Sequence, residues 1–232
     1  MPHVPDFAAF SQLAAGHGLA PVYRRLTADT LTPVSAFHKI DTGRCACLFE
    51  SVVGGEKVGR YSFLASDPFL EIEARGSHVA IRDAAGTKEF ESPNPIEELR
   101  QRVGQLEAAV LPELPPFTSG AVGYAGYDVV RYTERLPNAP TDDRGLPDLA
   151  FAFYDRMVVF DNVNKTLVVV AMARLDLFGS DLQGAYDDAC RRIDETVARL
   201  EAPEPSLRTA DIDTRHVPKI AYESNFTQPA FE

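Results

Sequence analysis

The stretch from Leu146 to Arg174, LPDLAFAFYDRMVVFDNVNKTLVVVAMAR, constrains the fold more than any other part of the sequence. It contains two long apolar runs on either side of DNVNK, a group of turn-forming residues. β-Branched and aromatic residues dominate both runs without regular polar alternation, which is typical of strands covered on both faces. The stretch therefore predicts two long strands in a central position in a sheet.

Shorter strand patterns and three clear helical patterns account for most of the remaining chain. Successive strands are joined by hairpin-like turns such as DAAG, and strands and helices do not alternate regularly. The sequence therefore predicts an α+β fold, predominantly an antiparallel β-sandwich or large sheet with about three flanking helices. Strands are expected at residues 20–27, 33–40, 45–53, 61–65, 69–74, 78–82, 88–90 and up to Tyr124, and helices at 6–16, 94–106 and 180–200, with a short helix from Asp128.

Several predicted helices have recognisable starting residues. Asp6 can cap the first helix, and Ser180 with Gln183 forms a capping-box pattern before the last long helix. Thr227 is placed to cap a further helix at the end of the chain. Between these two helices, Ala202–Ser206 (APEPS) has the composition of a linker.

Charge and composition exclude several classes of function. The formal net charge is −11, with 34 acidic residues against 23 basic ones, which argues against nucleic acid or an anionic membrane as the main partner. The five histidines are scattered and the three cysteines form no C-x-x-C pattern, so no metal site is expected. Cys45 and Cys47 are expected to be buried on one strand face. No signal peptide or membrane-spanning run is evident, and we expect a soluble, cytoplasmic protein.

Glycine-rich and charged motifs are better explained by packing than by chemistry. Gly120–Gly126 (GAVGYAG) has G-x-x-G-x-x-G spacing and not the dinucleotide-binding G-x-G-x-x-G, so close backbone packing is the preferred interpretation. Asp128, Arg131 and Glu134 follow at helical spacing and predict ion pairs along one helix face. Neither motif predicts an active site.

A polar pair interrupts the hairpin pattern between Cys47 and Leu64. Glu50–Ser51 follows an apolar strand, and Gly54–Gly55 turns the chain toward Tyr61. Because strand side chains alternate between faces, one member of the pair points toward the core side. A buried carboxylate requires a partner, for which a small cationic ligand is suited. The alternative is a hairpin whose Glu50 is solvated at the rim of the sheet.

The chain resembles, in order and over essentially its whole length, the N-terminal part of anthranilate synthase component I. In that family this region packs a β-sandwich against a chorismate-utilising catalytic domain, and the LFES motif belongs to a feedback site for L-tryptophan. The resemblance implies that Glu50 and Ser51 meet the polar end of L-tryptophan, and that Arg60, Tyr61 and Ser62 line the same pocket. The motifs that carry it are Pro21–Phe37, Leu48–Ser51, Gly54–Leu64, Gly120–Pro137 and Leu146–Val163.

The resemblance also predicts which parts of the chain have regulatory and catalytic roles. Residues 1–201 are expected to form the regulatory, tryptophan-binding domain, and 202–232 the linker and the start of the catalytic domain. The chain is expected to end where that catalytic domain begins, so we assign it no catalytic residue and no cofactor, and Mg²⁺ is expected in the catalytic domain. A glutamine amidotransferase subunit, component II, is the expected protein partner.

Two departures from the family pattern and two alternatives remain. Phe49 replaces the second leucine of the usual Leu-Leu-Glu-Ser, and Gln228–Ala230 replaces charged helix formers. The chain also resembles aminodeoxychorismate synthase component I, although the motif at Thr27–Phe37 (TADTLTPVSAF) favours anthranilate synthase. A stand-alone module that binds an amino acid or scaffolds the amidotransferase is the other alternative.

Overall fold

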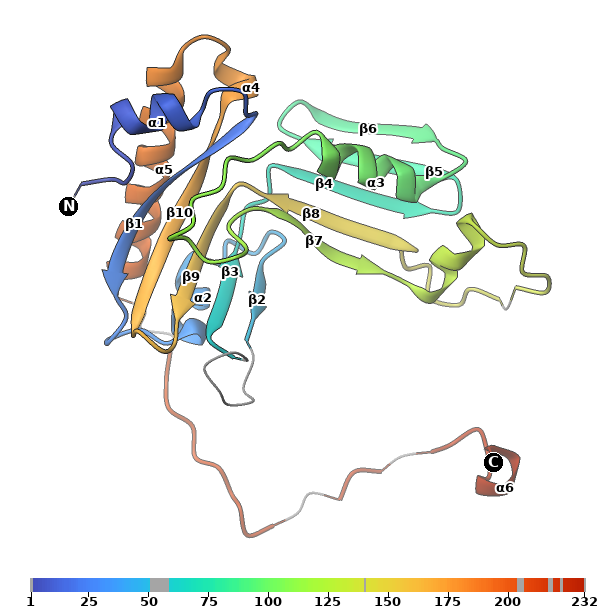
Figure 1. Cartoon of the computed structure of the whole chain (residues 1–232). Helices are drawn as coiled ribbons and strands as arrows, with labels where there is room; N and C mark the ends of the chain where they lie inside the picture. The colour runs from blue at the N-terminus through green and yellow to red at the C-terminus, as the bar shows by residue number, and fades with distance from the viewer. Residues whose placement is uncertain are drawn as a thin grey trace. The chain divides into compact units, whose positions relative to one another are not determined.

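The computed structural model describes residues 2–50, 59–139, 141–203, 207–216, 219–221 and 223–231. The chain divides into two units, Met1–Ala202 and Pro203–Glu232. The first unit contains two β-sheets and the helices around them (Figure 1). In the second, the described residues include one short helix, α6 (Gln228–Phe231), which begins directly after Thr227 as predicted. Within the described ranges, no helix is long and apolar enough to cross a membrane.

Both sheets have five antiparallel strands, which confirms the predicted α+β fold. Sheet A has the order β1-β10-β9-β3-β2, with bounds Leu19–Thr27, Thr166–Arg174, Arg156–Asp161, Tyr61–Ala65 and Cys47–Phe49. Sheet B has the order β6-β5-β4-β8-β7, with bounds Gly86–Glu91, His78–Asp83, Leu70–Arg75, Leu149–Tyr154 and Gly120–Ala125.

The long apolar stretch occupies interior positions in both sheets, as its composition predicts. However, the first predicted strand is two strands, because the chain passes from β8 in sheet B to β9 in sheet A at Asp155. The Asp155 carbonyl accepts a hydrogen bond from Met172 N at 2.7 Å. The chain changes sheet here without reversing direction, so no turn signal marks the boundary.

Helices cover one face of sheet A and enclose the largest buried cluster with it. α5 (Leu182–Glu201) lies along this face with α1 (Phe7–Leu13), α2 (Pro33–Ile40) and α4 (Leu175–Phe178) near it (Figure 1). Phe10, Leu64, Phe160 and Ile193 are among the buried residues of this helix-covered cluster. The opposite face of sheet A packs against the segment at 106–117 and part of sheet B. α3 (Pro95–Gly104) contributes Leu99 to the core of sheet B.

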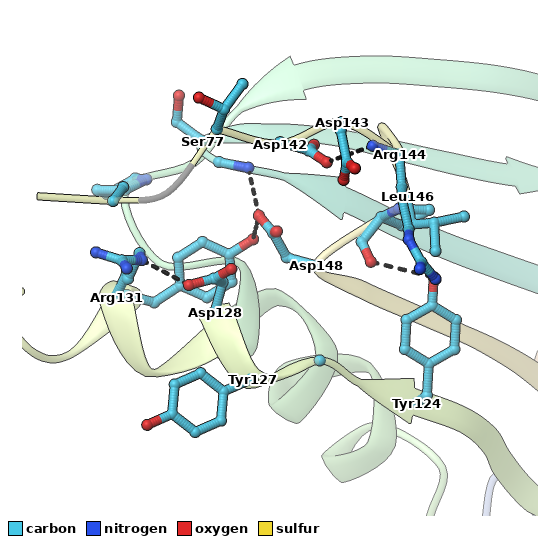
Figure 2. A pocket seen from close by; sticks show the side chains of 17 residues that line it. Ser77, Tyr124, Tyr127, Asp128, Arg131, Asp142, Asp143, Arg144, Leu146 and Asp148 are labelled. Atoms are coloured by element: carbon cyan, nitrogen blue, oxygen red, sulfur yellow. Dashed lines mark hydrogen bonds and ion pairs between the residues drawn. The ribbon is translucent and has the colours of Figure 1, made fainter. Parts of the chain in front are cut away.

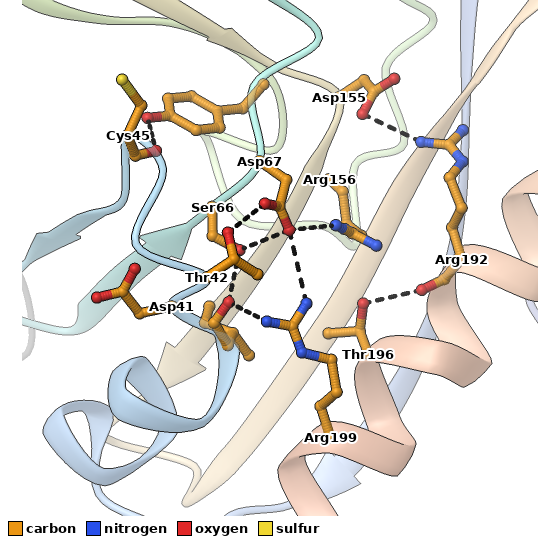
Figure 3. Close-up of polar contacts among 12 residues, drawn as sticks. Asp41, Thr42, Cys45, Ser66, Asp67, Asp155, Arg156, Arg192, Thr196 and Arg199 are labelled. Atoms are coloured by element: carbon orange, nitrogen blue, oxygen red, sulfur yellow. Dashed lines mark hydrogen bonds and ion pairs between the residues drawn. The ribbon is translucent and has the colours of Figure 1, made fainter.

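Ion pairs join α5 to the two points where the chain passes between sheets (Figure 3). Arg192 contacts Asp155 at 3.1 Å, and Arg199 contacts Asp67 at 3.6 Å in the passage from β3 to β4. Arg156 also donates to Asp67, at 3.3 Å. Burial of Arg156 lowers its pKa despite the nearby Asp67 carboxylate. We interpret this network as structural, because each arginine is paired with a carboxylate of the same fold.

Residues 33–40 form helix α2, so the strand predicted there is wrong. Thr32 and Ser35 form a reciprocal capping box, with Ser35 N donating to Thr32 Oγ1 at 3.1 Å and Thr32 N to Ser35 Oγ at 2.9 Å. Pro33 occupies the first turn, where its missing N–H costs nothing. Val34, Phe37 and Ile40 have helical spacing, but the β-branched residues and phenylalanine suggested a strand.

Four smaller predictions concern the caps of two helices, the burial of Cys45 and one short helix. Asp6 caps α1 by accepting from Ala9 N at 2.9 Å, as predicted. The predicted Ser180–Gln183 capping box is wrong, because Asp181 caps α5 by accepting from Gly184 N at 2.9 Å. Cys45 is exposed and has φ 38°, so its predicted burial is wrong. The predicted short helix is the 3-10 helix η1 (Tyr127–Tyr132).

Candidate functional site

Four of the predicted ligand-binding residues, Glu50, Arg60, Tyr61 and Ser62, lie where β2 ends and β3 begins, at one rim of sheet A. Antiparallel pairing aligns Leu48 with Leu64 and Phe49 with Phe63, which confirms the predicted hairpin. The ladder ends at Phe49 and Phe63, and Glu50 follows directly after β2. Glu50 is exposed, as the alternative of a solvated rim carboxylate predicts. Ser51 and the predicted turn at Gly54–Gly55 lie outside the described residues.

Tyr61 belongs to a short aromatic row on the face of sheet A opposite the helices. This aromatic row consists of Tyr61, Phe63 and Phe117, with ring centroids 6.0 Å apart for the first pair and 5.9 Å for the second. Phe49 pairs with Phe63 across the hairpin and is 50% exposed. Flat aromatic surfaces of this kind suit packing against another ring.

Arg60 is held by a carboxylate from a distant part of the chain. Its Nη2 donates to Asp161 Oδ2 at 2.8 Å, its Nε lies 3.3 Å from both carboxylate oxygens, and its guanidinium lies 4.9 Å from the Tyr61 ring centroid. Burial opposes ionisation of Asp161, but hydrogen bonds from Arg60 and Asn164 outweigh it and lower its pKa. The pair is therefore charged at neutral pH.

Ser62 lies on the other face and is almost fully buried, with 1% of its surface exposed. Asn162 Nδ2 donates to Ser62 Oγ at 3.0 Å, and Asn162 N donates to the Arg60 carbonyl at 2.8 Å. The structure thus brings Arg60 and Tyr61 together but places Ser62 on the opposite side of the strand. The sequence did not indicate these contacts of Asp161 and Asn162, because DNVNK predicted only a turn.

A hollow of about 730 Å³ lies beside η1 at the far end of sheet B (Figure 2). It is lined by η1, the loop before β8 and the turn between β4 and β5. Asp128 accepts from Arg131 Nε at 2.6 Å, which confirms that part of the predicted ion-paired face. Asp148 accepts from Tyr132 Oη at 2.9 Å and from Gly76 N at 2.7 Å. Burial and the Asp148 carboxylate raise the pKa of Tyr132.

These contacts indicate that the hollow results from the way the chain folds around η1. Four of its polar side chains, Asp128, Arg131, Tyr132 and Asp148, already make hydrogen bonds that fix η1 and the neighbouring turns. We assign it no chemistry. Among the residues whose positions are described, no group of three or more His, Cys, Asp or Glu side chains is arranged to hold a metal ion.

Comparisons with known proteins agree with one another. The family model for chorismate binding enzyme matches residues 45–229. Anthranilate synthase component 1 of Acetivibrio thermocellus is 37% identical over 199 residues, and that of Synechocystis sp. is 35% identical over 233 residues. The crystal structure of anthranilate synthase component I from Streptococcus pneumoniae TIGR4 superposes with a TM-score of 0.52 at 23% identity, which indicates a shared fold.

These matches cover most of this chain but less than half of each relative. They include 86% of the chain and 39% of the Acetivibrio protein, and 98% of the chain and 46% of the Synechocystis protein. The structural match covers 78% of this chain and 37% of the Streptococcus protein. The similarity therefore concerns one portion of a larger architecture.

Proposed function

Because the chain belongs to the chorismate-binding enzyme family and resembles anthranilate synthase component I, we propose that it is the N-terminal regulatory part of such an enzyme. In this proposal it binds L-tryptophan as a feedback inhibitor at the rim formed by β2 and β3. The proposed contacts are those that the resemblance implies, Glu50, Ser51, Arg60, Tyr61 and Ser62.

The observation that carries the proposal is the chemistry gathered at this rim. A free aromatic amino acid presents an ammonium group, a carboxylate and a flat ring. Glu50 offers an exposed carboxylate, Arg60 a guanidinium, and Tyr61 begins the aromatic row. Binding would bury the ring against these aromatic side chains, which is favourable by several kcal/mol in principle before ordering costs of about the same size.

The remaining functions belong to the enzyme as a whole. We propose that this enzyme converts chorismate and glutamine to anthranilate, pyruvate and glutamate in the cytoplasm, or uses free ammonia in place of glutamine. Its chorismate site and Mg²⁺ would be supplied by a catalytic domain, and its ammonia by a glutamine amidotransferase subunit. Tryptophan would inhibit by binding more tightly to the inactive arrangement of the two domains.

The absence of tryptophan from the chain, which has eight tyrosines, allows a direct test. Free L-tryptophan is excited beyond the tyrosine absorption band, and its fluorescence anisotropy is followed as purified chain is added. We expect a saturable rise that D-tryptophan does not produce. Glu50→Gln should weaken it by about tenfold, which corresponds to one lost charged contact, and Ser51→Ala should weaken it less.

Glu89→Gln is the matched control, because Glu89 is an exposed carboxylate on β6 of the other sheet. It should leave binding unchanged. A folded chain that gives no saturable signal, or one that binds both enantiomers equally, would contradict the proposed tryptophan site. Formation of fluorescent anthranilate from chorismate and ammonium by this chain alone would contradict its purely regulatory role.

A further inference from the structure

We propose that Phe117 couples the proposed ligand site on sheet A to β7, an outer strand of sheet B, so that a ring packed on the aromatic row stabilises β7. This inference rests on the proposed function and adds to it a route by which binding on one sheet affects the other. Phe117 is not among the contacts that the family resemblance implies.

The first argument is the origin of Phe117. Tyr61 and Phe63 lie on β3, whereas Phe117 belongs to the segment that precedes β7 in the chain. Its ring meets Phe63 edge to face, with centroids 5.9 Å apart and an interplanar angle of 70°. All three rings of the aromatic row keep part of their surface exposed, and the neighbouring Phe49 is 50% exposed. A ligand ring on this row would therefore restrict the motion of Phe117 as well as that of the β3 rings.

The second argument is the contact between Phe117 and the first residue of β7. Gly120 has a φ of 135°, and a Cβ at this position would lie 3.0 Å from Phe117 Cε2 and 3.6 Å from Phe117 Cζ. The phenyl ring thus packs directly on the Gly120 backbone, an arrangement that glycine permits at this φ and this distance. A shift of the Phe117 ring therefore acts on the start of β7.

The third argument is that β7 has few other supports. Among the described strands, β7 pairs only with β8, and its last three residues, 123–125, are exposed. Outer strands with few buried contacts open locally at low free energy. Val122 of β7 packs in the same cluster as Phe63 and Phe117, so this cluster joins β7 to sheet A. Strengthening it should make local opening of β7 rarer.

The connection from Phe117 to β7 leaves little slack. Figure 1 shows the segment before Phe117 crossing sheet A on its way to β7. Ala109 N donates to the Leu19 carbonyl at 2.8 Å, and the Glu113 carbonyl accepts from Arg25 Nη2 at 3.0 Å, so β1 holds the segment at two points. Two residues separate Phe117 from the start of β7. Movement of its ring is therefore passed to the strand and not absorbed by a long loop.

The other passages between the sheets predict a different pattern. Those at Asp67 and Asp155 join interior strands, and α5 fixes them through Arg199 and Arg192. Coupling through them would reach β4 and β8 before β7. Among the described residues of β6, the opposite outer strand of sheet B, none belongs to the cluster that contains Phe117. A comparison of β7 with β6 therefore distinguishes coupling through Phe117 from a general stabilisation of the sheet.

Hydrogen exchange followed by mass spectrometry tests this coupling in the whole chain. Amide exchange is compared without ligand, with L-tryptophan and with D-tryptophan. At a ligand concentration of 100 Kd, full linkage between binding and opening would slow exchange by about 100-fold. We expect the β7 amides to slow by about 5- to 50-fold with L-tryptophan and the β6 amides by less than about twofold. D-Tryptophan should slow neither.

Two variants assign the effect to Phe117. Phe117→Leu should bind L-tryptophan about 2- to 10-fold more weakly, as expected for the loss of one aromatic contact. At 100 times its own Kd, exchange should still slow in β3 but no longer in β7. Phe90→Leu is the matched control, because Phe90 is a partly buried ring on β6 beside Lys88. It should keep both the affinity and the response of β7.

Thermal unfolding identifies a variant that fails to fold, and Phe117→Met then replaces Phe117→Leu. Three results would each refute the coupling and leave the tryptophan site standing: equal slowing in β7 and β6, slowing in β3 without β7, or a β7 response that Phe117→Leu retains. If the folded parent chain gives no saturable anisotropy signal with L-tryptophan, the proposed function fails, and this inference fails with it.

Discussion

Replacing Gly123 by alanine should destabilise the protein strongly, because the glycine lets β7 approach β8 more closely than any side chain permits. Gly123 pairs with Phe151 in the ladder between the two strands. A Cβ at this position would lie 2.0 Å from the Ala150 carbonyl oxygen, 2.6 Å from Phe151 Cα and 2.8 Å from the Ala150 carbonyl carbon. All three are backbone atoms, so no side-chain rotation can relieve the contact.

The size of the effect follows from the movement required. Non-bonded heavy atoms rest about 3.5 Å apart, so β7 must shift by roughly 1.5 Å. Overpacking of this kind costs about 1–3 kcal/mol, and one or two weakened ladder hydrogen bonds add about 1 kcal/mol each. Because β7 is an edge strand that can move outward, we expect a total of about 3 kcal/mol. For a domain of this size, that lowers the melting temperature by roughly 6–12 °C.

Urea and thermal unfolding followed by circular dichroism measure this change. Gly104→Ala is the matched control, because a Cβ at the end of α3 meets nothing within 4 Å. It should leave stability unchanged or raise it by up to about 1 kcal/mol. If Gly123→Ala costs less than about 1 kcal/mol while the control behaves as expected, close strand approach does not explain the glycine.

Three further predictions concern polar contacts. The pKa of Asp161 is lower in the folded protein than the value of about 3.9 expected for the unfolded chain, so ionised Asp161 stabilises the fold at pH values above about 4. The free energy of unfolding should therefore fall as the pH drops below about 4. Asp161→Asn should remove this part of the pH dependence. Tyr154→Phe removes a 2.6 Å hydrogen bond to the Cys45 carbonyl and should cost about 1–2 kcal/mol in urea unfolding; no change would show that water replaces it. Thr32→Ala removes the cap of α2 and should lower the free energy of unfolding by about 1 kcal/mol. Adding Ser35→Ala to this variant should lower it little further, because both residues belong to one capping box; a double variant that loses the sum of the two single losses would contradict this.

The contrast between α5 and α2 shows which local patterns predict structure here. α5 repeats its apolar residues over five turns, and the prediction at 180–200 matches Leu182–Glu201 closely. α2 has only eight residues, and Val34, Phe37 and Ile40 suit a strand as well as a helix. The decisive signal is the reciprocal bonding of Thr32 and Ser35, a serine variant of the usual capping box. Short elements are decided by such end effects more than by periodicity.

The apolar stretch shows what periodicity cannot predict. Its composition correctly indicates strands in sheet interiors, yet the change of sheet at Asp155 depends on Arg192 and on the Met172 amide. Both partners lie well away in sequence. The passage could be predicted only with knowledge of which helix covers it.

The candidate site has the same division between local and distant information. The hairpin that carries Glu50, Arg60 and Tyr61 follows from the sequence because strand and turn residues are neighbours. The contact of Asp161 with Arg60 requires the pairing of β3 with β9, which places Tyr61 beside Asp161. No sequence pattern specifies that pairing. Long-range register, and not residue type, limited the prediction of the site.

The outer strands of the two sheets differ in how they oppose association between molecules. β1 carries Pro21 and is joined by the bridge between Val4 and Tyr23, and β6 carries Lys88 with two glutamates. β2 has only three residues. Proline, charge and short length all discourage a second chain from adding to a sheet. β7, GAVGYA, has neither charge nor proline. Among the described strands, it is therefore where another molecule would extend a sheet most readily, and where crowding or partial unfolding would first lead to aggregation.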